Sequence, residues 1–229
     1  MTAEAQERTG RSALVMGATG LVGGHCVDLL LNAAEYSKVR VLGRRPFGRP
    51  HPKLEDRVLD YDRFEEYSAL FAVDDIFCCL GTTIRKAGSP EAFRKVDVEF
   101  PATAARLGAE MGADQFLVVS ALGADPDSLI FYNKAKGEME AEVRRAPLRA
   151  VWVVRPSLLL GDREELRIGE RIAEVLLRPV APLLLGPLRR LRPIEAATVA
   201  AAMVALALSG GTGGTLESEE IAAVAASGA

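Results

Sequence analysis

Short apolar segments alternate with amphipathic ones along most of the chain. Six apolar runs are expected to form strands, at residues 13–16, 38–42, 57–59, 75–80, 115–120 and 150–154. Between them, apolar residues three and four apart predict helices at 22–34, 64–71, 90–112 and 131–145. Pro101 predicts a kink or break near Phe100. Because strands that alternate with helices form βαβ units, we expect an α/β protein with a doubly wound parallel sheet.

The C-terminal part has a weaker pattern. A helix is expected at 164–177, an alanine-rich helix at 194–208 and a last strand at 215–217. The prediction is one domain over residues 12–229 after a flexible lead-in at 1–11.

Residues 161–193 are expected to form a small C-terminal cap-like segment in the substrate region. Four prolines between residues 178 and 193 break any long helix, and leucines lie among them. This 178–193 segment is expected to cover a substrate pocket, to offer a surface to a protein partner, or to pack on the main core.

Composition and charge narrow the range of functions. The 229-residue chain has a net charge of −3 with acids and bases mixed, so no nucleic-acid partner is expected. Its three cysteines, Cys26, Cys78 and Cys79, are too few for a disulfide framework and indicate a reducing, cytoplasmic setting. The polar N-terminus lacks the apolar core of a signal peptide, and Pro, Arg or Glu interrupt the apolar runs, so no membrane span is expected. No metal-ligand spacing is present in the sequence.

A glycine-rich turn follows the first expected strand. Gly17, Gly20 and Gly23 recur at intervals of three residues between that strand and the next helix. Glycine permits a tight turn and a close approach of the backbone to a ligand. The helix that begins near Leu21 directs N–H groups and its positive dipole end toward an anion. The pattern predicts a Rossmann-type dinucleotide site with the pyrophosphate at this turn. A purely structural glycine turn is the alternative.

The ends of the next strands indicate which dinucleotide would bind. In a dinucleotide fold, the tip of the second strand meets the adenosine ribose, and an acid there would hold the 2′-hydroxyl of NAD. This chain has Arg44 and Arg45 instead, whose guanidinium groups suit a 2′-phosphate. We therefore predict NADP(H), with a solvated basic turn as the alternative. Asp60 is placed to bind the adenine, and Gly81 lets the central part of the cofactor lie against the backbone.

Candidate catalytic residues lie at the end of the fifth strand and on the helix after it. Tyr132 and Lys136 are four residues apart and share a helix face. A free tyrosine has a pKa of about 10, and a nearby ammonium favours the phenolate. Such a phenol can give a proton to a carbonyl or take one from an alcohol. Ser120 is placed to hydrogen-bond the same substrate oxygen, and Lys136 can also hold the nicotinamide ribose.

These segments together resemble a known family. Residues 17–23, Ser120 and residues 132–136 are similar to the short-chain dehydrogenase/reductase superfamily, with the glycine spacing of its atypical and extended members. More closely, the Cys-Cys-Leu-Gly-Thr-Thr run at 78–83 resembles the Tat-interacting protein group of oxidoreductase-like proteins. The resemblance extends over residues 14–170 and includes 44–45, 86–88, 136–138, 162–164 and 169–170.

The resemblance implies a Rossmann fold, NADPH binding and a Ser/Tyr/Lys constellation. It implies that Tyr132 donates the proton with Lys136 as its partner. It also implies that residues around Leu158 and Arg163 approach the nicotinamide. The expected cofactor-binding residues are Gly17, Ala18, Thr19, Gly20, Leu21, Val22, Gly23, Arg44, Arg45, Asp60, Leu80, Gly81, Thr82, Tyr132, Lys136, Leu158 and Arg163.

Two functions fit these residues. The first is an NADPH-dependent oxidoreductase that reduces a small carbonyl substrate, with Tyr132 as proton donor and Ser120 steadying the oxygen. The alternative is an NADPH-binding regulatory or interaction protein with little or no turnover, whose partner surface would be the 178–193 segment.

Overall fold

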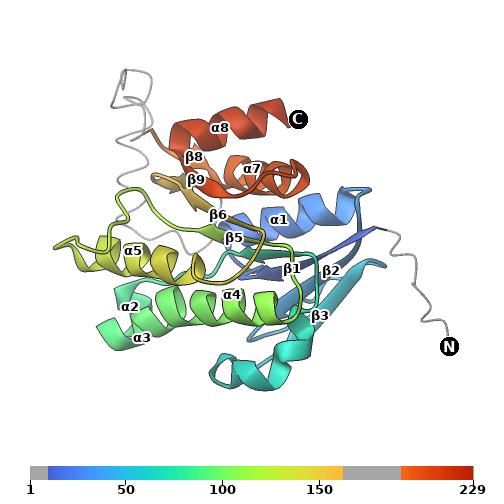
Figure 1. Ribbon diagram of the computed structural model, residues 1–229, viewed down its shortest axis with the longest axis horizontal. Coiled ribbons are helices and arrows are strands. Elements are labelled where there is room, and N and C mark those ends of the chain that lie inside the picture. Colours follow the sequence, from blue (N-terminus) through green and yellow to red (C-terminus); the bar gives the residue numbers. More distant parts are fainter. Residues whose placement is uncertain (1–9, 162–191, 229) are drawn as a thin grey trace.

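The computed structural model describes residues 10–161 and 192–228, and its centre is a seven-stranded parallel sheet (Figure 1). The strands lie in the order β3-β2-β1-β4-β5-β6-β9. Their bounds are β1 Arg11–Met16, β2 Tyr36–Gly43, β3 Leu54–Val58, β4 Asp75–Cys78, β5 Gln115–Val119, β6 Ala150–Arg155 and β9 Gly214–Glu217. This order confirms the expected doubly wound α/β fold of the Rossmann type.

Helices cover both faces of the sheet (Figure 1). One face carries α1 (Leu21–Asn32), α7 (Ala196–Leu208) and α8 (Ser218–Ser227). The other carries α2 (Ile84–Ala87), α3 (Pro90–Arg94), α4 (Phe100–Glu110), α5 (Phe131–Val143) and the 3₁₀ helix η1 (Tyr61–Phe71). A small second sheet pairs β7 (Leu159–Leu160) with β8 (Ile194–Glu195).

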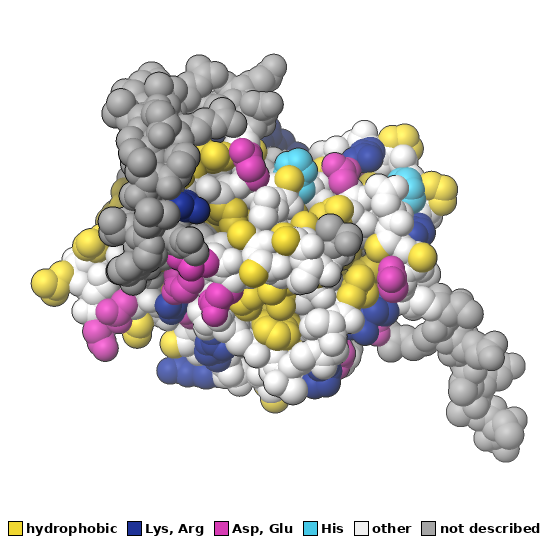
Figure 2. Space-filling model, turned by 90° about the horizontal axis from the view of Figure 1, so that it is seen from above, with side chains coloured by type: hydrophobic (Ala, Val, Ile, Leu, Met, Phe, Trp, Pro, Cys, Tyr) yellow, Lys and Arg dark blue, Asp and Glu magenta, His cyan; other side chains and the backbone are white. Residues whose placement is uncertain are grey.

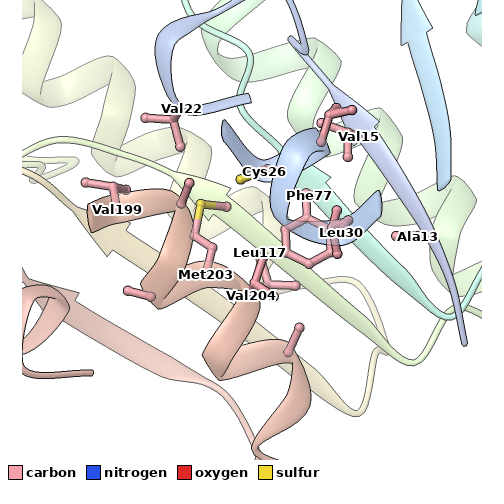
Figure 3. Packing of buried hydrophobic residues seen from close by; sticks show 14 of the residues in the cluster. Ala13, Val15, Val22, Cys26, Leu30, Phe77, Leu117, Val199, Met203 and Val204 are labelled. Atoms are coloured by element: carbon pink, nitrogen blue, oxygen red, sulfur yellow. The ribbon is translucent and has the colours of Figure 1, made fainter. Parts of the chain in front are cut away.

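Two apolar clusters hold these layers together. Side chains alternate along β1, so that Ala13 and Val15 belong to the cluster under α1 and α7, while Leu14 and Met16 belong to the opposite one. Figure 3 shows Met203 of α7 packed in the first cluster with side chains from α1, β4 and β5. Because a strand buried on both faces needs apolar residues throughout, β1 appears in the sequence as a continuous apolar run.

β1 begins at Arg11, inside the stretch expected to be a lead-in. The reason is a buried polar network at the amino edge of the sheet, centred on the fully buried Asp75. Its carboxylate accepts hydrogen bonds from Arg11 Nη2 at 2.6 Å, from the Tyr36 hydroxyl at 2.7 Å and from Gln115 Nε2 at 2.9 Å. The network therefore ties together four neighbouring strands, β1, β2, β4 and β5.

The expected helix at 90–112 is divided into three parts. α3 runs into a π-helical turn, η2 (Lys95–Glu99), and then into α4. The Phe100 N–H donates to the carbonyl of Lys95, five residues back, and Pro101, which has no N–H, lies in the first turn of α4. The break expected near Phe100 is thus a widened turn.

Other expected elements differ in their bounds or fall outside the description. The short helix α2, which the sequence pattern did not predict, is capped by the Thr83 hydroxyl, which accepts from the Lys86 N–H at 3.2 Å. The last strand and the alanine-rich helix are present as β9 and α7. The helix expected at 164–177, and all but the end of the 178–193 segment, lie outside the described residues.

The surface carries mixed charge. On the face shown in Figure 2, Lys and Arg side chains are interspersed with Asp and Glu, unlike the continuous basic surface typical of nucleic-acid binding. Within residues 10–161 and 192–228, none of the helices has the length and apolarity needed to span a bilayer. Over the same ranges, His, Cys, Asp and Glu form no cluster of three or more suited to a metal ion.

Candidate functional site

The candidate site lies at the carboxyl edge of the sheet, where β1 and β4 are neighbours. Met16 at the end of β1 pairs with Cys78 at the end of β4, and β2 flanks β1 on its other side. The strand order therefore reverses between β1 and β4. In open parallel sheets, ligands bind outside the carboxyl ends of the strands at this point.

The glycine turn follows β1 here and allows close backbone packing. Gly17 has φ +78°, and a Cβ on it would lie 2.4 Å from the carbonyl oxygen of Cys79. A Cβ on Gly23 would lie 2.2 Å from the carbonyl oxygen of Gly17. The Gly20 N–H closes the turn by donating to the Gly17 carbonyl at 2.8 Å. Side chains at Gly17 and Gly23 would therefore force the turn away from β4 or α1.

The N-terminus of α1 opens onto this turn without a side-chain cap. Gly20 is the N-cap residue, and the first turn of this twelve-residue helix has no acid. The first N–H groups of a helix lack intrahelical partners and carry the positive end of its dipole. Ala18 and Val22 are buried, Leu21 is half-buried and Thr19 is exposed. The arrangement suits an anion held by backbone amides.

Arg44 and Arg45 are exposed directly after β2, on the same edge of the sheet. Arg44 lies near the Tyr61 phenol, which donates to the carbonyl of Leu42 at 2.9 Å. Burial raises the pKa of Tyr61, and the Arg44 guanidinium partly offsets that rise. Asp60 is exposed, and its carboxylate caps η1 by accepting from the Asp62 N–H at 3.0 Å.

The turn after β4 is attached to η2 through a buried acid. Leu80 and Thr82 are half-buried and Gly81 is exposed. The Thr82 N–H donates to Oδ2 of Asp97 at 2.8 Å, and Asp97 is only 1% exposed. The backbone of this turn is therefore fixed by a side chain from a different element.

The same acid binds Lys136 on α5. Lys136 Nζ lies 2.8 Å from Oδ1 of Asp97, and the Lys136 side chain is only 5% exposed. Burial would lower the pKa of the Lys136 ammonium, but the nearby Asp97 carboxylate, together with Tyr132 in its phenolate form, outweighs burial and raises the pKa above its ordinary value. Lys136 is thus a charged group inside the protein.

Tyr132 lies one helical turn before Lys136 and is 38% exposed. Its ring packs against Phe93, with the ring centroids 5.9 Å apart. Within the described part of the chain, its hydroxyl has no hydrogen-bond partner, so it is available to a ligand. The pair expected to act together therefore consists of an accessible phenol and a buried ammonium.

Ser120 lies directly after β5 and is buried. Its hydroxyl donates to Oε1 of Glu140 at 2.5 Å, and Glu140 forms an ion pair with Arg155 at 2.7 Å. Tyr132, Lys136 and Glu140 follow each other at intervals of four on α5, which places them on one face. The proton of Ser120 is directed at Glu140 in this arrangement.

Leu158 and Arg163 are the two remaining residues that are expected near the nicotinamide, and the structure describes only the first of them. Leu158 is half-buried after β6, and its carbonyl accepts from the Ile194 N–H at 3.0 Å. Arg163 lies outside the described residues.

The sequence prediction missed Asp97 and Glu140. Asp97 is spaced four residues from both Phe93 and Pro101, which are buried, so a helical projection would have placed it on the inward face. Glu140 is four residues after Lys136 on the same predicted helix. In both cases, the sequence places an acid on a helix face that is expected to be buried. Because a buried acid needs a partner, this position could have indicated a polar contact inside the protein.

Comparisons with known proteins identify the family of this chain. Residues 13–128 match the model of the NAD-dependent epimerase/dehydratase family. The protein HTATIP2 of Rattus norvegicus is 36% identical over 167 residues, which cover 71% of this chain and 69% of that protein. The protein FMP52, mitochondrial, of Eremothecium gossypii is 34% identical over 153 residues, covering 67% of this chain and 68% of that protein.

Solved structures share the fold at low sequence identity. MoeE5 in complex with UDP-glucose and NAD superposes with a TM-score of 0.67 at 16% identity, covering 94% of this chain and 81% of that one. WbmH of Bordetella bronchiseptica in complex with NAD⁺ gives a TM-score of 0.67 at 13% identity, covering 91% and 75%.

The expectation of a cytoplasmic protein is contradicted by these relatives. The FMP52 proteins of Eremothecium gossypii, Candida albicans and Saccharomyces cerevisiae are all named mitochondrial. The low number of cysteines indicates a reducing environment, but it does not distinguish the cytoplasm from other compartments.

The family match and the identity to HTATIP2 confirm the resemblance found in the sequence. The chain belongs to the NAD-dependent epimerase/dehydratase family and, within the short-chain dehydrogenase/reductase superfamily, to the atypical members related to the Tat-interacting protein.

Proposed function

We propose that this protein binds NADPH at the glycine turn and reduces a small carbonyl compound, with Tyr132 as the proton donor. The observation that carries the proposal is a continuous set of contacts from the glycine turn to Lys136. Gly17 packs on the end of β4, the turn after β4 is bonded to Asp97, and Asp97 is bonded to Lys136, one helical turn from Tyr132.

The residues at the carboxyl edge fit a dinucleotide. The pyrophosphate would lie against the uncapped N-terminus of α1, and Gly17 and Gly23 would keep the turn in the tight conformation that exposes its backbone amides. Arg44 and Arg45 would contact the 2′-phosphate, because both are exposed directly after β2, where no acid is present to hold a 2′-hydroxyl. Gly81 and Thr82 would line the central part of the cofactor.

Each side chain then has a task in carbonyl reduction. A nicotinamide cofactor held by these residues would be the source of the hydride. Tyr132 gives its phenolic proton to the carbonyl oxygen, so that the product is an alcohol. The Lys136 ammonium orients the ribose hydroxyls and favours the phenolate that Tyr132 becomes. To donate to the substrate oxygen, Ser120 must turn its hydroxyl away from Glu140, which stays paired with Arg155.

Glycine substitutions test the binding site. We expect Gly23→Ala to lower NADPH affinity by about tenfold or more, because the new Cβ would displace the Gly17 carbonyl and with it the turn. Gly24→Ala is the matched control on the same helix. Its Cβ would lie 3.4 Å from the Ala18 carbonyl oxygen, which is an ordinary van der Waals distance, so the turn should stay in place. Calorimetric titration of both variants with NADPH measures the difference. Equal affinities would place the dinucleotide elsewhere.

Cofactor choice is tested at the end of β2. We expect Arg44→Ala with Arg45→Ala to weaken NADPH binding at least about tenfold, because even one hydrogen bond to a charged group contributes about 1.5–3 kcal/mol. NADH binding should change little. Arg49→Ala is the control, because Arg49 is exposed on the same loop but paired with Asp28. Equal losses for NADPH and NADH in the double variant would contradict recognition of the 2′-phosphate.

A regulatory protein without turnover is the second candidate, and one observation favours it. Leu129 and Ile130, just before Tyr132, are 104% and 62% exposed, an apolar pair of the kind found at interaction sites. A protein of this kind would bind NADPH yet oxidise none of it against a broad panel of aldehydes and ketones. NADPH oxidation that depends on an added carbonyl compound would support the reductase instead.

A further inference from the structure

We propose that Asp97 is a positioning residue of this site, which holds the buried Lys136 ammonium and ties it to the turn after β4. The inference rests on the proposed function, in which Lys136 serves the cofactor and Tyr132. It adds an acid to a constellation that was expected to consist of Ser120, Tyr132 and Lys136.

The geometry assigns the two carboxylate oxygens of Asp97 to different elements. Oδ1 lies 2.8 Å from Lys136 Nζ on α5, and Oδ2 accepts the Thr82 N–H at 2.8 Å. Asp97 itself belongs to the π-helical turn η2, a distortion often found at functional sites. One buried side chain therefore sets the distance between the helix that carries Tyr132 and the turn expected to line the cofactor.

The charges around Lys136 explain why the acid is needed. The groups that influence its ammonium are Asp97 on η2, Tyr132 on its own helix and Cys78 on β4. Burial raises the pKa of the Cys78 thiol to about 12, so that thiol is neutral in the physiological range. An ammonium buried without a counter-charge tends to lose its proton. Asp97 is the carboxylate that opposes this tendency, and it thereby keeps Lys136 charged.

The direct test follows the protonation of Lys136 in the ligand-free protein. Lysines labelled with ¹³C at Cε are titrated by NMR, and Lys136 is assigned from the signal missing in Lys136→Met. We expect the wild-type Lys136 to stay protonated beyond pH 10.5, the ordinary midpoint of a lysine. We expect Asp97→Asn to move the midpoint to lower pH, because the amide keeps an acceptor for Thr82 but carries no charge.

Glu138→Gln is the matched control. Glu138 is two residues from Lys136 on α5 but is paired with Arg94, so its loss should leave the Lys136 midpoint unchanged. A wild-type midpoint below 10.5 would overturn the proposal without any variant. A midpoint that is the same in the wild type and in Asp97→Asn would also overturn it.

Activity gives a second readout with a distinct signature. We expect Asp97→Asn to lower kcat about ten- to a hundredfold at pH 9, with a smaller loss at pH 6, where Lys136 is protonated again. A purely structural role would lower kcat equally at both pH values and would overturn the proposal. If the wild type reduces no carbonyl compound, the proposed function fails, while the NMR titration still decides the role of Asp97.

Discussion

Replacing Tyr132 by Phe is expected to lower NADPH-dependent carbonyl reduction about 10²- to 10⁴-fold. The variant removes the phenolic oxygen alone and keeps the ring that packs against Phe93. Without a proton donor, the oxygen of the substrate would develop negative charge that no group neutralises. NADPH affinity should stay within about threefold of the wild-type value, because the turn and the arginines are untouched. Steady-state kinetics and calorimetry on the same preparation measure both quantities.

Tyr67→Phe is the matched control for this experiment. Tyr67 is half-buried on η1, away from the predicted catalytic residues, so the loss of its hydroxyl should leave kcat unchanged. Unchanged turnover in Tyr132→Phe would remove Tyr132 from the mechanism. Equal losses in both variants would indicate general damage to the fold and would also count against the assignment.

The second large effect is expected at the opposite edge of the sheet. We expect Asp75→Ala to lower the free energy of unfolding by about 3–5 kcal/mol, since it breaks a buried ion pair and leaves donors without an acceptor. The donors that lose this acceptor are the Arg11 guanidinium, the Tyr36 hydroxyl and the Gln115 amide, of which the amide keeps its bond to the Ala207 carbonyl. Urea denaturation at neutral pH measures the loss. The change leaves the glycine turn intact, so the folded fraction should still bind NADPH.

An exposed ion pair provides the comparison for Asp75. Asp28 and Arg49 face each other with side chains that are 48% and 50% exposed, so Asp28→Ala should change the stability by about 1 kcal/mol or less. A loss at Asp75 no larger than the loss at Asp28 would mean that the network does not hold the strands together. A Tyr36→Phe variant should show an intermediate loss, because it removes one donor and leaves the acid paired with Arg11.

Most of the fold could be predicted from local patterns. The central strands β1, β4 and β5 are buried on both faces, so each appears as a short apolar run, and the helices between the strands have apolar residues at helical spacing. The edge strand β3 is partly exposed and carries charged residues, so it was expected at 57–59 instead of Leu54–Val58. The bounds were less predictable where a polar contact sets them. β1 extends to Arg11 because of Asp75, which is distant in sequence. The π-turn at Lys95–Glu99 is visible in the sequence only through Pro101.

The candidate site was predictable in part, for a physical reason. Glycines at a turn and a Tyr and a Lys four residues apart are local signals, and the structure places the turn at the carboxyl edge of the sheet. Asp97 and Glu140 act through residues on other elements, Lys136 and Ser120, so their partners emerge only once the layers are packed. The compartment could not be derived from cysteine content, and the mitochondrial names of relatives correct it.

Calorimetric titration of the purified protein with NADPH, and in parallel with NADH, tests the central proposal most directly. One NADPH should bind per chain at micromolar or lower concentration, and NADH should bind at least about tenfold more weakly. The absence of binding heat for both nucleotides across several temperatures, together with no change in melting temperature, would contradict a dinucleotide site at the glycine turn.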